Sequence, residues 1–350
     1  MSEVSPEQRV DAPLGSLGAY TTLRLGGPAG LLTVATEPDE AVEAVRNASA
    51  AGEPLLILAG GSNVVVGDAG FPGHVVLLRT RGIREIARDE EFVTLRVAAG
   101  EVWDDFVART VAEGLSGVEC LAGIPGSAGA TPIQNVGAYG QEVAHTIVAV
   151  HAYDRVADET VTMTAAECGF GYRSSTFKYS DRWLVLQVDF RLARSGESAP
   201  IRYAELARQL GVGPGDRVPL EQARETVLKL RAGKGMVLDP DDRDTWSVGS
   251  FFTNPVVAEL PEPDMPHWPA EGGRVKIPAA WLIEHSGFAK GFSTGGGVAI
   301  SSKHTLALTN RGAGTTTALL ELARVIRDGV RDRFGVELHP EPVLIGCEFD

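Results

Sequence analysis

The sequence is poor in cysteine. Three cysteines occur in 350 residues, Cys120, Cys168 and Cys347, and they form no CxxC pair. An odd number of widely spaced cysteines argues against a disulfide framework and against a zinc site, and it fits a reducing cytosol. We therefore expect no structural disulfide, no bound metal and a cytoplasmic location.

Positive charge and long apolar runs are also scarce. The formal net charge is −14, which disfavours a broad surface for nucleic acid or for an anionic membrane. An anionic small ligand is still compatible with this charge, provided that its positive partners are local. No apolar run approaches the length of a membrane span, and the polar, acidic N-terminus differs from a signal peptide. We expect a monomer or weak oligomer that binds neither nucleic acid nor membrane.

Glycine, by contrast, is abundant, with 41 residues, and the length predicts two or three domains. Residues 1–15 read as a loose tail. Residues 27–66 predict a β-α-β unit, because a helical pattern opens at Pro38 and ends near Gly52 between two apolar runs. Residues 73–195 predict an α+β domain with a mainly antiparallel sheet, and later helices are expected at 219–232 and 315–335.

Two glycine-rich segments follow short predicted strands. In LAGGSNVVV, consecutive glycines can expose backbone N–H groups as an anion-binding nest, although the segment matches neither the Rossmann nor the P-loop pattern. Taken alone, it fits a plain strand–turn–strand connection equally well. The second segment, residues 120–142, is long and almost uncharged, so it must be covered by protein or by a ligand. Both segments together favour a cofactor cradle.

A third segment, GSFFTNP at 249–255, reads alone as a turn leading into an extended arm. The ordered set LAGGSNVVV, AGIPGSAGATPIQNVGAYGQE, FGYRSSTFK, LRAGKGMVLDP, GSFFTNP and LHPEPVLIG resembles the UDP-N-acetylenolpyruvoylglucosamine reductase family. The resemblance runs from about residue 20 to the C-terminus. It implies non-covalently bound FAD, NADPH as electron donor, and reduction of enolpyruvyl-UDP-N-acetylglucosamine to UDP-N-acetylmuramate for peptidoglycan synthesis.

The same resemblance implies an α+β fold, in which two subdomains form a PCMH-type or vanillyl-alcohol-oxidase-like FAD-binding domain and a further α+β domain binds substrate. The implied boundaries are 16–195 for the FAD domain (subdomains 16–72 and 73–195) and 196–224 for a connector carrying a substrate loop. The substrate domain takes 225–338, and 339–350 forms a strand that returns to the FAD region. The segments YSDRW and IRYAEL favour the larger, first subtype.

Matching motifs also imply the roles of individual residues. The catalytic set is Arg173, Ser250 as proton donor, and Glu341. The residues implied to bind the cofactor are Gly60, Gly61, Ser62, Asn63, Ile124, Pro125, Gly126, Ser127, Thr131, Gly137, Ala138 and Tyr139. Tyr203, Lys234 and Asn254 match substrate-binding positions, and His285 stands where the family often has Gln. Taken singly, Arg173 is more typical of a surface ion pair, and Glu341 and Ser250 of turns, so the assignment depends on the ordered set of motifs.

Two other functions are compatible with parts of this pattern. Another flavoenzyme of the same fold, such as an oxidase, predicts a covalent attachment residue near the glycine-rich segments. Only Cys120 and His145 lie there, neither in a setting typical of attachment. A non-catalytic nucleotide-binding protein would have no need of Arg173, Ser250 and Glu341 together.

Overall fold

The computed structural model describes residues 15–350, which form two compact units. The large-sheet unit contains Gly30–Gly60 and Gly73–Gly233, and the C-terminal unit contains the chain up to Ala29, Gly61–Pro72 and Lys234–Asp350. The expected tail at 1–15 lies outside the described residues except for Gly15. The domain boundaries implied by the resemblance stay a prediction.

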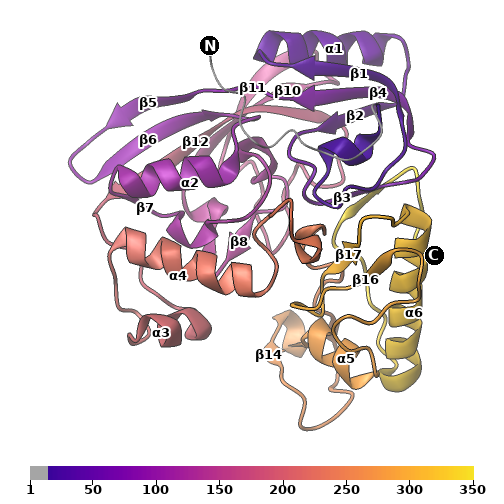
Figure 1. The fold of residues 1–350 in the computed structure, drawn as a ribbon. Helices are drawn as coiled ribbons and strands as arrows, with labels where there is room; N and C mark the ends of the chain where they lie inside the picture. The colour runs from indigo at the N-terminus through magenta and orange to yellow at the C-terminus, as the bar shows by residue number, and fades with distance from the viewer. Residues whose placement is uncertain (1–14) are drawn as a thin grey trace. The chain divides into compact units, whose positions relative to one another are not determined.

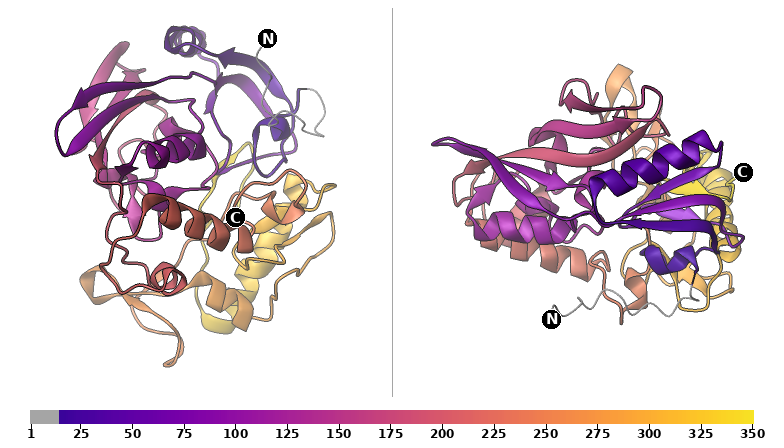
Figure 2. Two further views of the ribbon diagram at one scale, coloured as in Figure 1. Left: turned by 60° about the vertical axis from the view of Figure 1, so that its left-hand side comes forward. Right: turned by 90° about the horizontal axis from the view of Figure 1, so that it is seen from above.

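The expected β-α-β elements are present in the large-sheet unit as β1 (Ala29–Ala35), α1 (Pro38–Ala50) and β2 (Leu55–Leu58). Pro38 opens the helix, and Ala41, Val45 and Ala48 bury one of its faces. The later strand β4 (Phe71–Leu78) lies between β1 and β2 and runs parallel to β2. The sheet order is therefore β1-β4-β2, with α1 against it in Figures 1 and 2.

The second sheet of this unit is antiparallel, as expected. Its order is β11 (Glu159–Thr164), β10 (Ile147–Asp154), β12 (Trp183–Arg194), β6 (Phe92–Ala98) and β5 (Ile83–Arg88), and β7 (Leu115–Ser116) pairs with β12. Residues 74–78 were expected among these strands by pattern, but they belong to β4. One face of the sheet buries Val188, Phe190 and Leu192, with Phe190 packed on Trp103 and Phe106.

Besides α1, the α-helices of this unit are α2 (Trp103–Ala112), α3 (Ala204–Leu210) and α4 (Leu220–Gly233). The last agrees with the helix expected at 219–232. Between α2 and β10 the chain forms a short hairpin, β8 (Gly137–Ala138) and β9 (Gln141–Glu142), and three 3-10 helices at Glu119–Leu121, Ala128–Ala130 and Val143–His145. The second glycine-rich segment is therefore almost entirely loop, turn and 3-10 helix.

In the C-terminal unit, α6 (Thr316–Phe334) packs against α5 (Ala279–His285) and against the hairpin of β16 (Val298–Ile300) and β17 (Leu308–Asn310). A small sheet has the order β13 (Val256–Val257), β15 (Val275–Lys276), β14 (Trp268–Pro269). Further 3-10 helices lie at Leu17–Tyr20, Arg243–Thr245 and Glu271–Gly273. Gly335, with φ +67°, ends α6 in the left-handed conformation that glycine favours.

The C-terminal segment pairs with a segment far earlier in the chain. β18 (Val343–Ile345) runs parallel to β3 (Val64–Val66), which directly follows the first glycine-rich segment. Before this strand, an isolated bridge joins Pro340 to Phe252. Across residues 15–350, every helix is too short or too polar to cross a membrane.

Candidate functional site

The two glycine-rich segments approach each other by their backbones. A Cβ added at Gly60 would lie 2.5 Å from Cα of Gly126, and one added at Gly61 would lie 2.0 Å from the carbonyl oxygen of Tyr20. Gly61 also has φ +58°. Since neither position has room for a side chain, glycine is required here by close backbone approach.

Ser127 is the clearest candidate for a ligand-binding side chain in the large-sheet unit. Its side chain is buried, and its Oγ has no hydrogen-bond partner among residues 15–350. A buried unpaired hydroxyl costs stability, so a ligand that accepts or donates a hydrogen bond here recovers that cost. The neighbouring Ile124, Pro125 and Gly126 are half-buried. An exposed-backbone loop with a buried hydroxyl suits the diphosphate of FAD.

Thr131 has a different local role from Ser127. Its Oγ1 donates to the carbonyl of Ala128 at 2.7 Å, closing the 3-10 helix that follows Ser127. The side chain thus stabilises the shape of the loop. A direct cofactor contact by Thr131 stays a prediction.

The next part of the segment is a tight hairpin. Tyr139 (φ +49°) and Gly140 (φ +85°) form the turn between β8 and β9, and two successive positive φ values match the twist of a two-residue hairpin. The ring of Tyr139 meets that of Tyr203 edge-on, with centroids 5.3 Å apart. A residue implied to bind cofactor therefore contacts one implied to bind substrate, and Tyr203 is 44% exposed.

Arg173 belongs to another turn, but its side chain binds this same hairpin. It occupies the third position of the turn Gly171–Ser174 with φ +50°. Its Nη2 donates to the carbonyl of Gly137 at 2.7 Å, and Nη1 to the carbonyl of Asn135 at 3.4 Å. The motifs FGYRSSTFK and QNVGAYGQE are thus joined through the guanidinium.

In the C-terminal unit, Ser250 and Glu341 lie on paired backbone segments. The N–H of Glu341 donates to the carbonyl of Phe251 at 2.8 Å, and the N–H of Thr253 donates to the carbonyl of His339 at 3.0 Å. Residues 251–253 therefore form an extended arm beside 339–341. Ser250, half-buried, precedes this pairing directly and Glu341 is part of it.

The arm is anchored by aromatic packing. Phe251 and Phe252 are fully buried, their rings meet edge-on at 5.0 Å, and both contact the ring of Phe349. Gly249 has φ +73° with no crowding around its missing side chain. The positive φ, and not crowding by a neighbouring atom, explains why glycine occupies that position.

The first glycine-rich segment reaches the same place. The N–H of Val343 donates to the carbonyl of Asn63 at 3.0 Å, at the start of the β18–β3 pairing. Glu341 lies two residues before Val343 in the chain, and its own N–H bonds to Phe251. Asn63 is therefore connected, through this C-terminal segment, to the arm that follows Ser250. The C-terminal unit brings together Gly61–Asn63, Ser250 and Glu341 from three distant parts of the sequence.

The other residues implied to bind substrate lie in the same unit. Asn254 Oδ1 accepts the N–H of Ala279 at 2.9 Å and so fixes the start of α5. His285 is exposed at the end of α5; its ring stacks on Trp281 at 3.7 Å, and its Nδ1 is 2.8 Å from the carbonyl of Trp281. Because a carbonyl only accepts, Nδ1 is the donor. Lys234 is half-buried just beyond α4.

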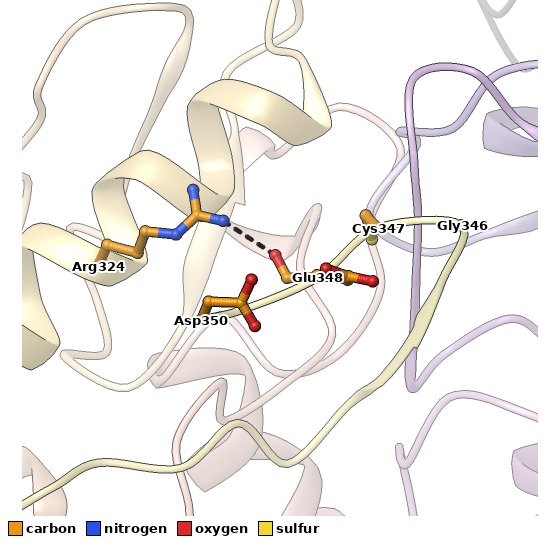
Figure 3. Close-up of a pocket in the computed structure, with 5 residues that line it drawn as sticks. All are labelled: Arg324, Gly346, Cys347, Glu348 and Asp350. Carbon is orange, nitrogen blue, oxygen red and sulfur yellow. Dashed lines mark hydrogen bonds between the residues drawn. The ribbon is translucent and has the colours of Figure 1, made fainter.

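An open pocket elsewhere in the C-terminal unit is separate from these residues. It is lined by Arg324 of α6 and by Gly346, Cys347, Glu348 and Asp350 of the chain end (Figure 3). Arg324 Nη2 donates to the carbonyl of Glu348 at 2.9 Å. The lining contains none of the predicted site residues, and two of its five residues carry carboxylates, so it is poorly suited to the anionic ligands expected here.

Sequence patterns counted Asn135, with Ser127, among the side chains of the second glycine-rich segment that can hydrogen-bond a ligand, but they did not show that it connects residues 142–144 to the turn Gly171–Ser174. Asn135 is buried and has φ +45°. An asparagine inside a glycine-rich loop was the available signal, because Asn adopts the left-handed conformation more readily than other side-chain-bearing residues.

Comparison with known proteins agrees with this geometry. The model of the FAD binding domain family matches residues 28–164. The model of the UDP-N-acetylenolpyruvoylglucosamine reductase C-terminal domain matches residues 239–345. These matches cover the glycine-rich segments and the segments of Ser250 and Glu341, respectively.

Relatives match the chain over nearly all of its length. The UDP-N-acetylenolpyruvoylglucosamine reductase of Salinispora arenicola is 62% identical over 95% of this chain and 94% of its own. That of Streptomyces coelicolor is 57% identical over 96% and 90%, respectively. The crystal structure of the Thermus caldophilus enzyme superposes with a TM-score of 0.66 at 25% identity, covering 94% of this chain and 97% of that one.

These matches confirm the α+β FAD-binding fold, the cofactor FAD and the use of NADPH as reductant. They confirm an oxidoreductase that serves peptidoglycan precursor synthesis. The chain belongs to the UDP-N-acetylenolpyruvoylglucosamine reductase family.

Proposed function

We propose that this protein reduces the enolpyruvyl ether of UDP-N-acetylglucosamine to UDP-N-acetylmuramate, with Arg173, Ser250 and Glu341 acting on the enolpyruvyl group. The observation that carries the proposal is the backbone pairing of Phe251 with Glu341, which holds the serine and the glutamate on neighbouring segments.

The cofactor is held by the glycine-rich segments. The backbone of Gly60–Asn63 and the buried hydroxyl of Ser127 suit its diphosphate, while Gly137, Ala138 and Tyr139 contact the rest. Bound FAD, reduced by NADPH, supplies a hydride to the vinyl CH₂ of the substrate. Backbone N–H groups hold the diphosphate without a large basic patch, which agrees with the acidic net charge.

The protein's own residues then stabilise charge and deliver a proton. As negative charge develops on the adjoining carbon and its carboxylate, the guanidinium of Arg173 stabilises it with planar, fixed donors. Glu341 shares a proton or hydrogen bond with the enolate-like group. Ser250 protonates the alpha carbon, because even a weakly acidic hydroxyl is competent against a strongly basic carbanion-like centre.

Tyr203, Lys234 and Asn254 hold the sugar nucleotide, and His285 contributes one hydrogen bond at most. The exposed ring of Tyr203 offers a surface for the substrate, and the cation of Lys234 matches a diphosphate. The enzyme acts on small molecules, and we place it in the cytoplasm, where both UDP-sugars and NADPH occur, as a monomer or weak oligomer.

Stopped-flow measurement of the two half-reactions in Ser250→Ala tests this assignment. We expect flavin reduction by NADPH to change less than about twofold, and anaerobic flavin re-oxidation by the enolpyruvyl substrate to slow by at least about 100-fold, the low end for loss of an acid catalyst. Ser250→Cys is the matched control, since a thiol keeps a proton donor and retains part of the rate. Re-oxidation at the wild-type rate in Ser250→Ala would remove Ser250 from the mechanism.

A further inference from the structure

Asn135 is a buried connector in the large-sheet unit. Its side chain is 2% exposed, and its backbone adopts φ +45°. For any residue other than glycine, positive φ is uncommon and persists only where surrounding contacts hold it. The side-chain amide of Asn135 makes such contacts.

The side-chain amide of Asn135 binds three separate pieces of backbone or side chain. Its Nδ2 donates to Glu142 Oε2 at 2.9 Å and to the carbonyl of Gly171 at 3.0 Å. Its Oδ1 accepts the N–H of Ala144 at 3.1 Å. Both amide hydrogens and the amide oxygen are therefore engaged, in three of the four hydrogen bonds that an asparagine side chain can make.

One of these bonds reaches the turn that carries Arg173. The carbonyl of Gly171 also accepts the N–H of Ser174 at 3.3 Å, and the N–H of Gly171 donates to the carbonyl of Ser174 at 3.0 Å. Gly171 and Ser174 thus form the base of a four-residue turn with Arg173 near its tip. Asn135 fixes the base of that turn from outside.

Asn135 also contacts the guanidinium through its own backbone. Arg173 donates to the carbonyls of Asn135 and Gly137. A Cβ added at Gly137 would lie 3.2 Å from Arg173 Nη1 and 2.7 Å from Glu142 Cγ. The guanidinium therefore lies against the hairpin and is held there by hydrogen bonds to two backbone carbonyls.

We infer that Asn135 is a positioning residue for Arg173: it locks the Arg173 turn to the cofactor-binding hairpin, so that the guanidinium is oriented before the substrate arrives. A preorganised donor stabilises developing charge without reorganisation at the moment of reaction, and small misplacements of such a donor are costly. The inference rests on the role proposed above for Arg173.

Two variants of the FAD-loaded enzyme, Asn135→Gly and Arg173→Lys, test the inference. Glycine keeps the positive φ and removes the amide. We expect Asn135→Gly to slow flavin re-oxidation at saturating substrate by about tenfold or more, because a misplaced donor acts on the chemical step. Flavin reduction by NADPH should change less than about twofold. A merely structural role would slow both half-reactions together or lower the FAD content.

The double variant shows whether Asn135 acts through Arg173. We expect Asn135→Gly added to Arg173→Lys to slow re-oxidation by less than about twofold beyond Arg173→Lys alone, since residues that act as a unit are non-additive. If the losses of re-oxidation rate in the two single variants multiply in full in the double variant, the inference is overturned. Normal re-oxidation in Arg173→Lys would instead overturn the proposed function, which keeps the two failures distinct.

A matched control and a second variant complete the design. Asp158 also has positive φ, +54°, in the same unit, but lies in the β10–β11 hairpin and binds Arg46 and Tyr153. Asp158→Gly should leave both half-reactions at wild-type rates. If Asn135→Gly fails to fold, Asn135→Asp gives the same readout, because it keeps the shape and replaces both N–H donors with an acceptor. Wild-type re-oxidation in that variant would equally refute the inference.

Discussion

At the scale of single residues, Asp189 shows how the large sheet tolerates a charge on its polar face. It lies on β12, and its carboxylate accepts two hydrogen bonds from Arg96 at 2.7 and 2.8 Å and one from His151 at 2.9 Å. Burial alone would raise its pKa, but these bonds outweigh burial and lower the pKa to about 2. The network spans three neighbouring strands, β10, β12 and β6.

This pKa gives a prediction for stability against pH. A carboxyl group with a lowered folded-state pKa stabilises the protein above its unfolded value, here 3.8, and that contribution is lost as the pH falls toward about 2. Asp189→Ala also leaves Arg96 and His151 without their partner. At pH 7 we expect its free energy of unfolding to be lower than wild type by about 3 kcal/mol.

Urea unfolding with saturating FAD at pH 7 and at pH 3 measures this difference. The gap between Asp189→Ala and wild type should narrow at the lower pH, because the unfolded wild-type carboxyl is then mostly protonated. A gap of the same size at both values would show that the network contributes through packing and not through charge. Glu113→Ala is a suitable control, since its ion pair with Arg109 is exposed and such pairs contribute little.

At the scale of elements, helix α6 is tied to the segment that follows the first glycine-rich loop. Asp68 Oδ1 and Oδ2 accept the N–H groups of Thr316 and Thr317 at 2.7 and 2.8 Å, and Oδ2 also accepts the hydroxyl of Thr317. Burial would raise the pKa of Asp68, but these hydrogen bonds lower it. A carboxylate at a helix N-terminus also interacts favourably with the helix dipole.

Removing this cap tests whether the helix supports the cofactor loop. Asp68→Ala should destabilise the protein by about 1–2 kcal/mol, the usual range for a lost N-cap. It should also weaken FAD binding, because Asp68 anchors the segment that begins with Gly61–Asn63. Thr315→Ala removes the ordinary cap, the hydroxyl that accepts from Ala318 N–H, and should destabilise without changing the FAD dissociation constant. Equal FAD affinities in both variants would contradict the link.

The helices and strands also show which features of the fold local sequence patterns predict and which they do not. α1 and α4 were predictable, because apolar periodicity and end signals are local. The insertion of β4 between β1 and β2, and the pairing of Phe251 with Glu341, are not encoded locally, since tertiary packing alone selects such partners. The roles of Ser250 and Glu341 came from the ordered motifs, while the connecting role of Asn135 is visible only in the hydrogen bonds of the folded loop.

At the scale of the whole molecule, the glycine-rich segments distinguish a dissociable flavin from a covalent one. Cys120 and His145 are the nearby attachment candidates. Cys120 is 2% exposed, and burial, together with the neighbouring Glu119, raises the pKa of its thiol. A buried thiol with a raised pKa is a poor nucleophile. His145 is exposed at the end of a 3-10 helix.

We therefore expect all of the flavin to leave the chain on denaturation. Purified protein should be yellow, and after unfolding in guanidinium chloride and ultrafiltration the flavin absorbance should pass into the filtrate. Protein that has been refolded, or gently stripped of its flavin, should regain thermal stability when FAD is added. The gain in stability should rise with FAD concentration, because a ligand that binds only the folded state stabilises it by mass action. Colour that stays on the denatured chain would instead favour an oxidase-like covalent attachment. A Cys120→Ala variant that released the colour would then identify the attachment residue.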